Sequence, residues 1–210
     1  MDDLREFTSF IKPSPSVKKA KTERTFFGFT KQLPVYLNQE TFEVCKGAYP
    51  YLVPSLRQDT CPRRIASVRW EIIDNSEPFE IEGLFRIVPL PVLHGGDYIC
   101  LGFAFGEEPK NIYLSDVSAV QPHIMSQLLE YEIEVLVLDC LDKSKSPSHF
   151  CLPDSLELIR KLRPKKTFLV GMSCEFGEHT AENKVLQTME EDEGLWVQCA
   201  HDGLRIDLNM

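Results

Sequence analysis

Three apolar runs follow one another between Arg86 and Ser118, and they constrain the fold more than any other part of the chain. The stretch reads RIVPLPVLHGGDYICLGFAFGEEPKNIYLSDVS, and turns rich in glycine or containing proline separate the runs. Each run is short for a helix, and runs of this length between turn residues are typical of buried strands. We therefore predict three consecutive strands, the first ending at His94 and the third at Asp116.

The pattern changes after Asp116 to alternating helices and strands. Pro122 suits the first turn of a helix, and EVLVLDCL follows as a buried strand with Asp139 at its end. After a second helix, TFLVGMSC predicts a strand that ends at Cys174. The closing stretch LWVQCAHDGLRIDL is interpreted as two strand segments joined by a turn. Strands first and helix–strand alternation later predict a layered α/β or α+β domain.

Four of the predicted strands end in a residue that can bind a metal or a substrate. These residues are His94, Asp116, Asp139 and Cys174, and His149 lies in a loop between a strand and a helix. Each also has a structural explanation, since His94 alone fits a hydrogen-bonded turn histidine and Asp116 fits a turn or cap carboxylate. Together they indicate a common site at one edge of the sheet, although spacing alone does not identify its chemistry.

Composition restricts the kind of partner and the compartment. The 210 residues carry a formal net charge of −9, which argues against broad binding to a nucleic-acid backbone, because such binding needs clustered Lys and Arg. The seven cysteines include no CxxC pair, which indicates buried thiols in a reducing compartment. No apolar run reaches the roughly 18 residues that a membrane span needs. We expect a soluble, cytoplasmic protein with a small substrate.

The length and the 43% hydrophobic content predict a single globular domain over residues 1–210. Near its start, residues 12–25 combine prolines, serines and basic residues, which predicts an exposed, mobile loop rather than a binding patch. The stretch LPVYL then predicts a short strand, and Asn38 suits the N-cap of the helix that follows it.

The order of these segments resembles the metallo-β-lactamase superfamily. The matching segments are the strand followed by His94, YLSDVS around Asp116, VLDCL with SPSHFCLPDSLELIRKLRPKKTFLVGMS after it, and QCAHDGLRI. Within the superfamily, the chain resembles small hydrolases related to phosphoribosyl cyclic phosphodiesterase. The resemblance implies an α+β fold, a four-layer αββα sandwich, with two zinc or manganese ions at one edge of its sheets. It also implies a hydrolase of small phosphodiesters that uses metal-activated water.

The resemblance also implies a role for individual residues. His94 matches the histidine that binds one metal ion, and Asp116 matches the aspartate that bridges both. His149 corresponds to a catalytic, substrate-binding histidine that faces the phosphate, where it binds an oxygen or protonates the leaving group. Imidazole and carboxylate are ordinary zinc ligands, and a two-metal site stabilises both oxygens of a displacement. Cys174 replaces the metal-binding histidine of the family's GMSH or GMTH motif, and a thiolate suits zinc better than manganese.

The family's HxHxDH motif, which supplies four metal ligands, is absent from the chain. The segment from Asp2 to Arg5 resembles the one that follows this motif in relatives, so the chain is expected to begin just after it. His94, Asp116 and Cys174 are then its metal ligands. Tight binding of two metals is not expected from these residues, and we expect a truncated or impaired, N-terminally incomplete form of the hydrolase.

Three other functions stay open on the sequence. A catalytically silent member would use the fold to bind a partner or a nucleotide-like ligand. A tRNA-processing nuclease shares the fold and the His, Asp, His order, but the acidic composition disfavours it. A thiol enzyme would use Cys174 with His179, although buried cysteines are usually inert. A homodimer is one assembly that the sequence allows. Further ligand candidates near Cys174 are Glu175, Glu178 and His179.

Overall fold

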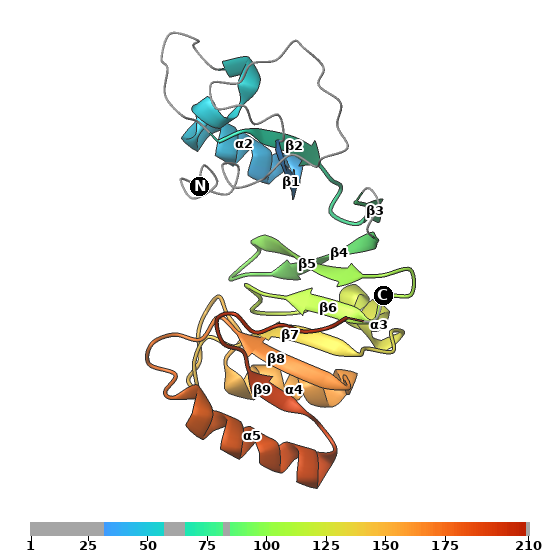
Figure 1. The fold of residues 1–210 in the computed structure, drawn as a ribbon, viewed down its shortest axis with the longest axis vertical. Helices are drawn as coiled ribbons and strands as arrows, with labels where there is room; N and C mark the ends of the chain where they lie inside the picture. The colour runs from blue at the N-terminus through green and yellow to red at the C-terminus, as the bar shows by residue number, and fades with distance from the viewer. Residues whose placement is uncertain (1–31, 57–65, 82–84, 209–210) are drawn as a thin grey trace, which may run out of the picture. The chain divides into compact units, whose positions relative to one another are not determined.

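The computed structural model describes residues 32–56, 66–81 and 85–208. The chain divides into two compact units, the first ending at Asp74 and the second beginning at Asn75 (Figure 1). The predicted mobile loop at residues 12–25 lies outside the described residues. The single domain over residues 1–210 stays a prediction.

The first unit combines two parallel strands with a helix. Its elements are β1 (Leu33–Leu37), α2 (Gln39–Ala48), the 3₁₀ turns η1 (Pro50–Leu52) and η2 (Pro54–Leu56), and β2 (Val68–Ile72). Helix α2 begins where the sequence predicted, because Asn38 Oδ1 accepts a hydrogen bond from Thr41 N at 2.9 Å. Leu52 and Val68 are each 1% exposed, and Trp70 packs against this small core and donates from Nε1 to Leu52 O at 3.2 Å.

A seven-stranded mixed sheet organises the second unit (Figure 1). In spatial order its strands are β3 (Phe79–Glu80), β4 (Arg86–Leu93), β5 (Ile99–Phe105), β6 (Asn111–Leu114), β7 (Val135–Asp139), β8 (Lys166–Val170) and β9 (Val197–Cys199). Its helices are α3 (Pro122–Leu129), α4 (Leu152–Leu162) and α5 (His179–Glu193). Neighbours from β3 to β6 are antiparallel, whereas those from β6 to β9 are parallel and need helical crossovers. None of the helices α2 to α5 is long and apolar enough to cross a membrane.

Most of the predicted elements are confirmed, and two strand predictions are wrong. The three apolar runs form β4, β5 and β6, and Pro122 opens α3. Strand β8 ends at Val170 rather than at Cys174, because Gly171 adopts a φ of 78° that takes the chain out of the sheet. Of the two strand segments predicted in the closing stretch, only β9 forms, and residues 204–208 carry no strand.

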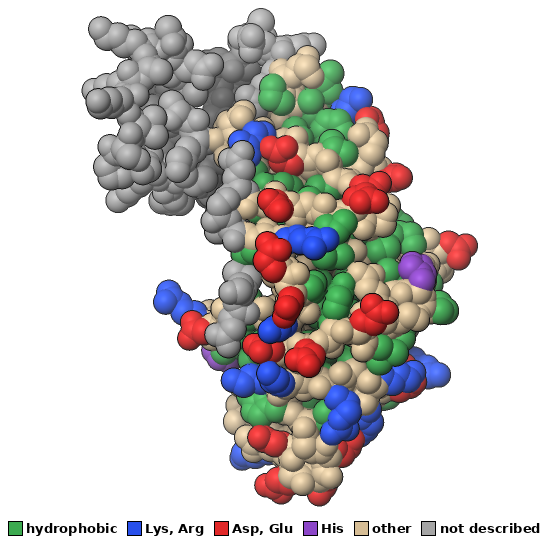
Figure 2. Space-filling view, turned by 90° about the vertical axis from the view of Figure 1, so that its right-hand side faces the viewer, with side chains coloured by type: hydrophobic (Ala, Val, Ile, Leu, Met, Phe, Trp, Pro, Cys, Tyr) green, Lys and Arg blue, Asp and Glu red, His purple; other side chains and the backbone are tan. Residues whose placement is uncertain are grey.

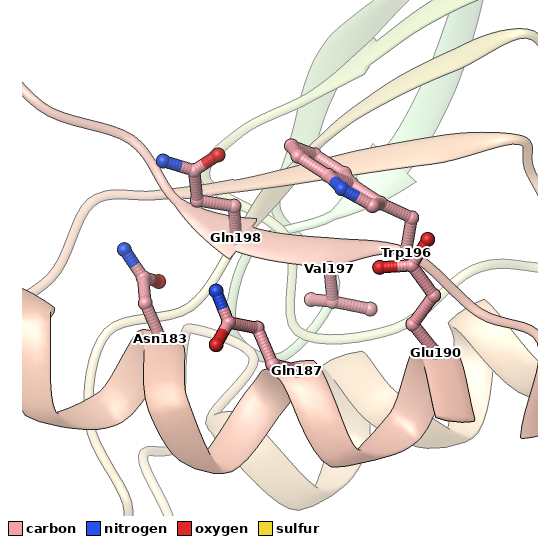
Figure 3. Close-up of a pocket in the computed structure, with 6 residues that line it drawn as sticks. All are labelled: Asn183, Gln187, Glu190, Trp196, Val197 and Gln198. Carbon is pink, nitrogen blue, oxygen red and sulfur yellow. The ribbon is translucent and has the colours of Figure 1, made fainter. Parts of the chain in front are cut away.

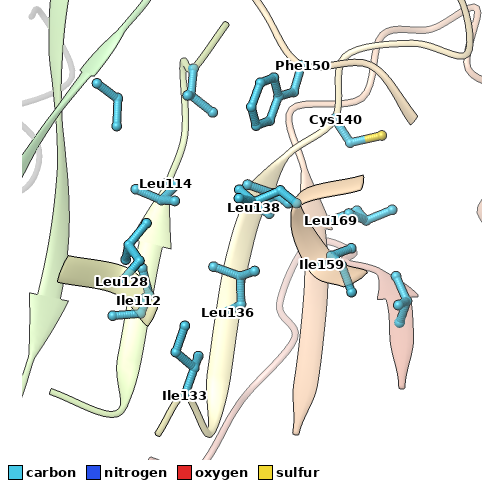
Figure 4. Close-up of a cluster of buried hydrophobic side chains, with 14 of the residues drawn as sticks. Ile112, Leu114, Leu128, Ile133, Leu136, Leu138, Cys140, Phe150, Ile159 and Leu169 are labelled. Atoms are coloured by element: carbon cyan, nitrogen blue, oxygen red, sulfur yellow. The ribbon is translucent and has the colours of Figure 1, made fainter. Parts of the chain in front are cut away.

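The main apolar core lies between the sheet and its helices (Figure 4). Leu136 and Leu138 of β7 point to the same side because alternate strand residues share a face. Both are 0% exposed and pack in one cluster with Leu128 of α3 and Ile159 of α4. Burying each such side chain contributes about 1.5–3 kcal/mol. This core holds the carboxyl ends of β4, β6 and β7 in a fixed arrangement.

Candidate metal centre

His94, Asp116 and His149 come together at one edge of the seven-stranded sheet. His94 follows β4, Asp116 follows β6, and His149 lies in the loop after β7. These strands run in the same direction, because β4 and β6 are both antiparallel to β5 and β7 is parallel to β6. One ligand atom of each side chain lies within 4.8 Å of the other two, and the two histidine ring centroids are 4.6 Å apart. The fold thus gathers three residues that the sequence singled out.

A backbone carbonyl sets the orientation of His94. Its Nδ1 lies 2.7 Å from Ser148 O, and a carbonyl oxygen only accepts hydrogen bonds, so Nδ1 donates and Nε2 keeps its lone pair. Metal-binding histidines usually have this arrangement, with the second ring nitrogen bonded to a carbonyl or carboxylate. Gly95 permits the close approach, since it has a φ of 78° and a Cβ there would lie 3.0 Å from Ser148 Cβ. His94 is therefore prepared to bind through Nε2.

Asp116 is the most exposed member of the group, with 57% of its side chain accessible. Its φ of 55° lies in the left-handed region, which aspartate tolerates better than most residues. The backbone just after it is tied to the end of β4, because Ser118 N donates to Leu93 O at 2.6 Å and Ser118 Oγ accepts from Gly95 N at 2.9 Å. Hydrogen bonds thus connect the segments that carry His94 and Asp116.

A buried carboxylate, Asp139, orients His149. The side chain of Asp139 is 1% exposed, and its Oδ2 lies 2.8 Å from His149 Nδ1 and 3.1 Å from Val117 N. Burial raises the pKa of Asp139 above its ordinary value, and the hydrogen bonds from His149 and Val117 oppose that rise. The Asp139 carbonyl also accepts from Ser155 Oγ at 2.7 Å. Because Nδ1 of His149 is hydrogen-bonded to the Asp139 carboxylate, Nε2 is the ring nitrogen that remains available to a metal or a substrate.

Cys174 lies outside the group formed by the two histidines and Asp116. Its thiol is exposed, and it follows the end of β8 in an irregular segment. Glu175 and Glu178 are also exposed, and His179 packs edge-on against Phe176 with ring centroids 6.4 Å apart. None of these residues joins the described group of three, so metal binding by Cys174 stays a prediction.

Two contacts of the site had no signal in the sequence. Asp139 was recognised as a strand-end residue, but nothing in its spacing from His149 indicates that the two would pair. The Ser148 group that binds His94 is a backbone carbonyl, which every residue has. Only the path of the loop after β7 brings these groups into place, and no periodicity in the sequence encodes that path.

A separate pocket lies between helix α5 and strand β9 (Figure 3). It is lined by Asn183, Gln187, Glu190, Trp196, Val197 and Gln198. The lining is largely polar, and Asn183 Oδ1 already accepts a hydrogen bond from Cys199 N at 2.7 Å. None of the lining residues belongs to the group at the edge of the sheet, so the pocket is distinct from the candidate metal centre.

The chain is similar to proteins of known family and structure. The family model described as "Beta-lactamase superfamily domain" matches residues 21–172. A diphosphatase from the PhnP family is similar at 27% identity with a TM-score of 0.65, over 83% of this chain and 57% of that one. Zinc-bound PqqB from Methylobacterium extorquens has 13% identity and a TM-score of 0.61, over 85% and 66%. Unliganded yeast PDE1 has 12% identity and a TM-score of 0.60, over 82% and 59%. No curated protein sequence matches the chain.

These comparisons differ in what they support. The family match spans more than half of the chain. The likenesses to PqqB and PDE1 concern the fold alone, because their sequence identities are low. The chain spans less than two thirds of the length of each of the three solved structures.

Proposed function

This chain belongs to the metallo-β-lactamase superfamily and has its α/β fold with mixed sheets. On that premise, we propose that it is a metal-dependent hydrolase of the phosphodiesterase type. The observation that carries the proposal is the convergence of His94, Asp116 and His149 within 4.8 Å. The similarity to a diphosphatase from the PhnP family supports a substrate with a phosphoester or phosphoanhydride bond.

The three side chains fit a divalent metal ion. Two imidazoles and one carboxylate are ordinary zinc ligands, and His94 has the Nδ1 hydrogen bond typical of a ligand. His94 and Asp116 would hold the ion, zinc or manganese, with His149 beside them. A bound ion of this kind lowers the pKa of water and polarises a phosphoryl oxygen. His94 and Asp116 thus provide two donors to one ion, and further ligands have to come from outside this group, for which Cys174 is the proposed candidate.

His149 is the proposed catalytic acid. The hydrogen bond between its Nδ1 and Asp139 Oδ2 keeps the ring in one orientation and stabilises it when it is protonated. Nε2 can then donate a proton to the leaving oxygen or a hydrogen bond to a phosphate oxygen. Asp139 stays buried and acts only through His149.

A small, compact substrate suits the acidic composition of the chain better than a nucleic acid does. The chain has a formal net charge of −9. On the face that Figure 2 shows, acidic and basic side chains of the described residues are interspersed rather than gathered into a basic patch. Binding to a polyanion needs such a patch. We therefore propose a small phosphodiester as the substrate, and we do not propose that the chain processes precursor tRNA.

Hydrolysis of bis-p-nitrophenyl phosphate by the purified chain, with added zinc or manganese, tests this proposal. Turnover is expected to depend on the metal and to be lost in Asp116→Asn. Asp192→Asn is the matched control, because Asp192 is exposed in α5 and lies outside the group. Turnover that is unchanged in Asp116→Asn would overturn the proposal.

The second candidate is a catalytically silent member that binds a ligand. The observation that favours it is the small number of donors, since the described residues bring only His94, Asp116 and His149 to this group. Metal analysis and turnover separate the two candidates. Stoichiometric metal with turnover supports the hydrolase, whereas a chain that binds a phosphodiester without hydrolysing it supports the silent member.

We also propose that the sheet is one half of a four-layer αββα sandwich within a single domain. In β5, Ala104 faces the helix-covered core, so Phe103 and Phe105 face the opposite side of the sheet. Their ring centroids are 6.5 Å apart, and Leu101 shares their face. A sheet that is apolar on both faces needs cover on both. Phe103→Asp is expected to unfold the chain if a second sheet covers this face and to be tolerated if water does.

A further inference from the structure

The loop between β7 and α4 carries two groups of the candidate metal centre. Ser148 O accepts the hydrogen bond from His94 Nδ1, and the ring of His149 belongs to the group itself. The ends of the loop are closed by a hydrogen bond from Leu141 N to Phe150 O at 2.8 Å. The positions of the carbonyl and the imidazole therefore depend on what holds the loop between those ends.

Lys143 ties this loop to the first turn of α5. Its Nζ forms an ion pair with Glu182 and lies 5.6 Å from the centre of the Phe176 ring. The Glu182 side chain is only 16% exposed, and Phe176 is 1% exposed. Partial shielding from water strengthens an ion pair relative to a fully exposed one, and the aromatic face adds a cation–π attraction. The ion pair and the ring contact thus join the loop to a buried aromatic ring and to a helix.

A second connection runs beside the first. Ser173 N donates to Leu141 O at 2.8 Å, and Ser173 Oγ donates to Asp142 Oδ2 at 3.4 Å. Residues 141–143 and the segment leading into α5 are therefore connected through backbone and side chains.

We propose that Lys143 is a positioning residue that, paired with Glu182, holds the loop so that the Ser148 carbonyl and the His149 ring meet His94. The inference deepens the proposed metal-binding function and rests on it for its effect on metal affinity. Without the pair, the loop samples more conformations, and ordering it opposes metal binding. The protein core does not depend on the pair, since Lys143 is half-exposed.

The test compares Lys143→Met, which keeps an apolar stem, with Lys143→Arg, which keeps the charge and the ring contact. Zinc affinity is measured by titration calorimetry on the full chain. Lys143→Met is expected to weaken zinc binding about two- to fivefold, the effect of losing a partly shielded ion pair, and Lys143→Arg to restore most of it. Glu182→Gln is expected to match Lys143→Met, and the double variant to be no weaker than either single one.

Two measurements without metal complete the test. Amide hydrogen exchange of residues 144–149 is expected to rise in Lys143→Met, and the nitrogen chemical shifts of His94 are expected to show a mixture of tautomers. Arg160→Ala is the matched control, because Arg160 pairs with Glu193 at the other end of α5 at 2.8 Å. Arg160→Ala is expected to change neither the hydrogen exchange of the loop nor the nitrogen chemical shifts of His94.

Unchanged exchange and unchanged His94 shifts in Lys143→Met would overturn the proposal, whatever the metal does. If the unaltered chain binds no zinc, the proposed function fails, and the two metal-free measurements still decide whether Lys143 positions the loop.

Discussion

His149 Nδ1 lies 2.8 Å from Oδ2 of Asp139, a carboxylate with only 1% of its side chain exposed at the end of β7. A charge at such a position is stable only when it is paired and hydrogen-bonded. Val117 N supplies a second hydrogen bond to the same oxygen at 3.1 Å. The pair therefore serves the protein twice, because it satisfies a buried carboxylate and orients an imidazole at the candidate metal centre.

Replacing Asp139 by Asn tests the role of this pair. The amide keeps the shape but removes the charge that holds the proton on His149 Nδ1, so the proposed acid loses its orientation. We expect turnover to fall about 10- to 100-fold, as for other partners that orient site histidines. The measurement is kcat/KM with bis-p-nitrophenyl phosphate. Asp97→Asn, an exposed acid in a turn, is the control, and full turnover in Asp139→Asn would contradict the role.

Metal binding is expected to stabilise the folded chain. A ligand present at about 100 times its Kd adds about 2.7 kcal/mol, so zinc should raise the Tm and a chelator should reverse the rise. His94→Ala and Asp116→Asn each remove one donor and should abolish the rise. Calorimetric scans with and without zinc measure it. If both variants keep the full shift, zinc binds elsewhere.

Two neighbouring glycines provide an internally controlled test of the loop contact. Gly95 and Gly96 have φ values of 78° and 54°, so alanine is strained at both by about 1–2 kcal/mol. A Cβ at Gly95 would also lie 3.0 Å from Ser148 Cβ, whereas nothing lies within 4 Å of one at Gly96. We expect Gly95→Ala to weaken zinc binding and Gly96→Ala to affect only stability. Equal zinc affinities would show that the loop does not depend on this approach.

The cysteines are expected to differ in reactivity. Burial raises the pKa of Cys140 to about 12 and that of Cys199 to about 11, whereas Cys174 is exposed. The thiolate is the reactive form, so iodoacetamide at pH 8 should label Cys174 first and the other two only after unfolding. Mass spectrometry of timed samples follows the labelling. Labelling of Cys140 as fast as that of Cys174 would contradict its burial.

The raised pKa of Cys140 leads us to expect that the folded chain loses stability at alkaline pH. The folded chain keeps the Cys140 proton up to about pH 12, whereas the unfolded thiol releases it near its ordinary pKa of 9.0. The folded state therefore binds more protons between these values, and its stability is full below pH 9 and falls as the pH rises toward 12. Urea unfolding at pH 8, 9.5 and 11 measures this slope. Cys140→Ala should make it shallower and leave the part that comes from Cys199, whose pKa is also raised.

Local patterns in the sequence predicted the strands β4, β5 and β6 and the start of α3, because alternation, turn residues and proline act over a few residues. The same patterns placed His94 and Asp116 at strand ends. They failed where a single backbone angle ended an element, since TFLVGMSC is apolar up to its last residues while Gly171 leaves the sheet. The local patterns also failed at the closing stretch, where residues 204–208 were predicted to form a strand but form none.

The sequence by itself determined which residues could bind a metal and that strand ends would carry them, because residue type and strand length are local properties. The order of the segments also predicted that His149 shares a site with His94 and Asp116. The tertiary structure alone decided that Asp139 orients His149 and that Cys174 lies outside the group. Those relationships depend on parallel strand order and on the path of one loop. Both arise from packing between segments far apart in the chain, which no local pattern records.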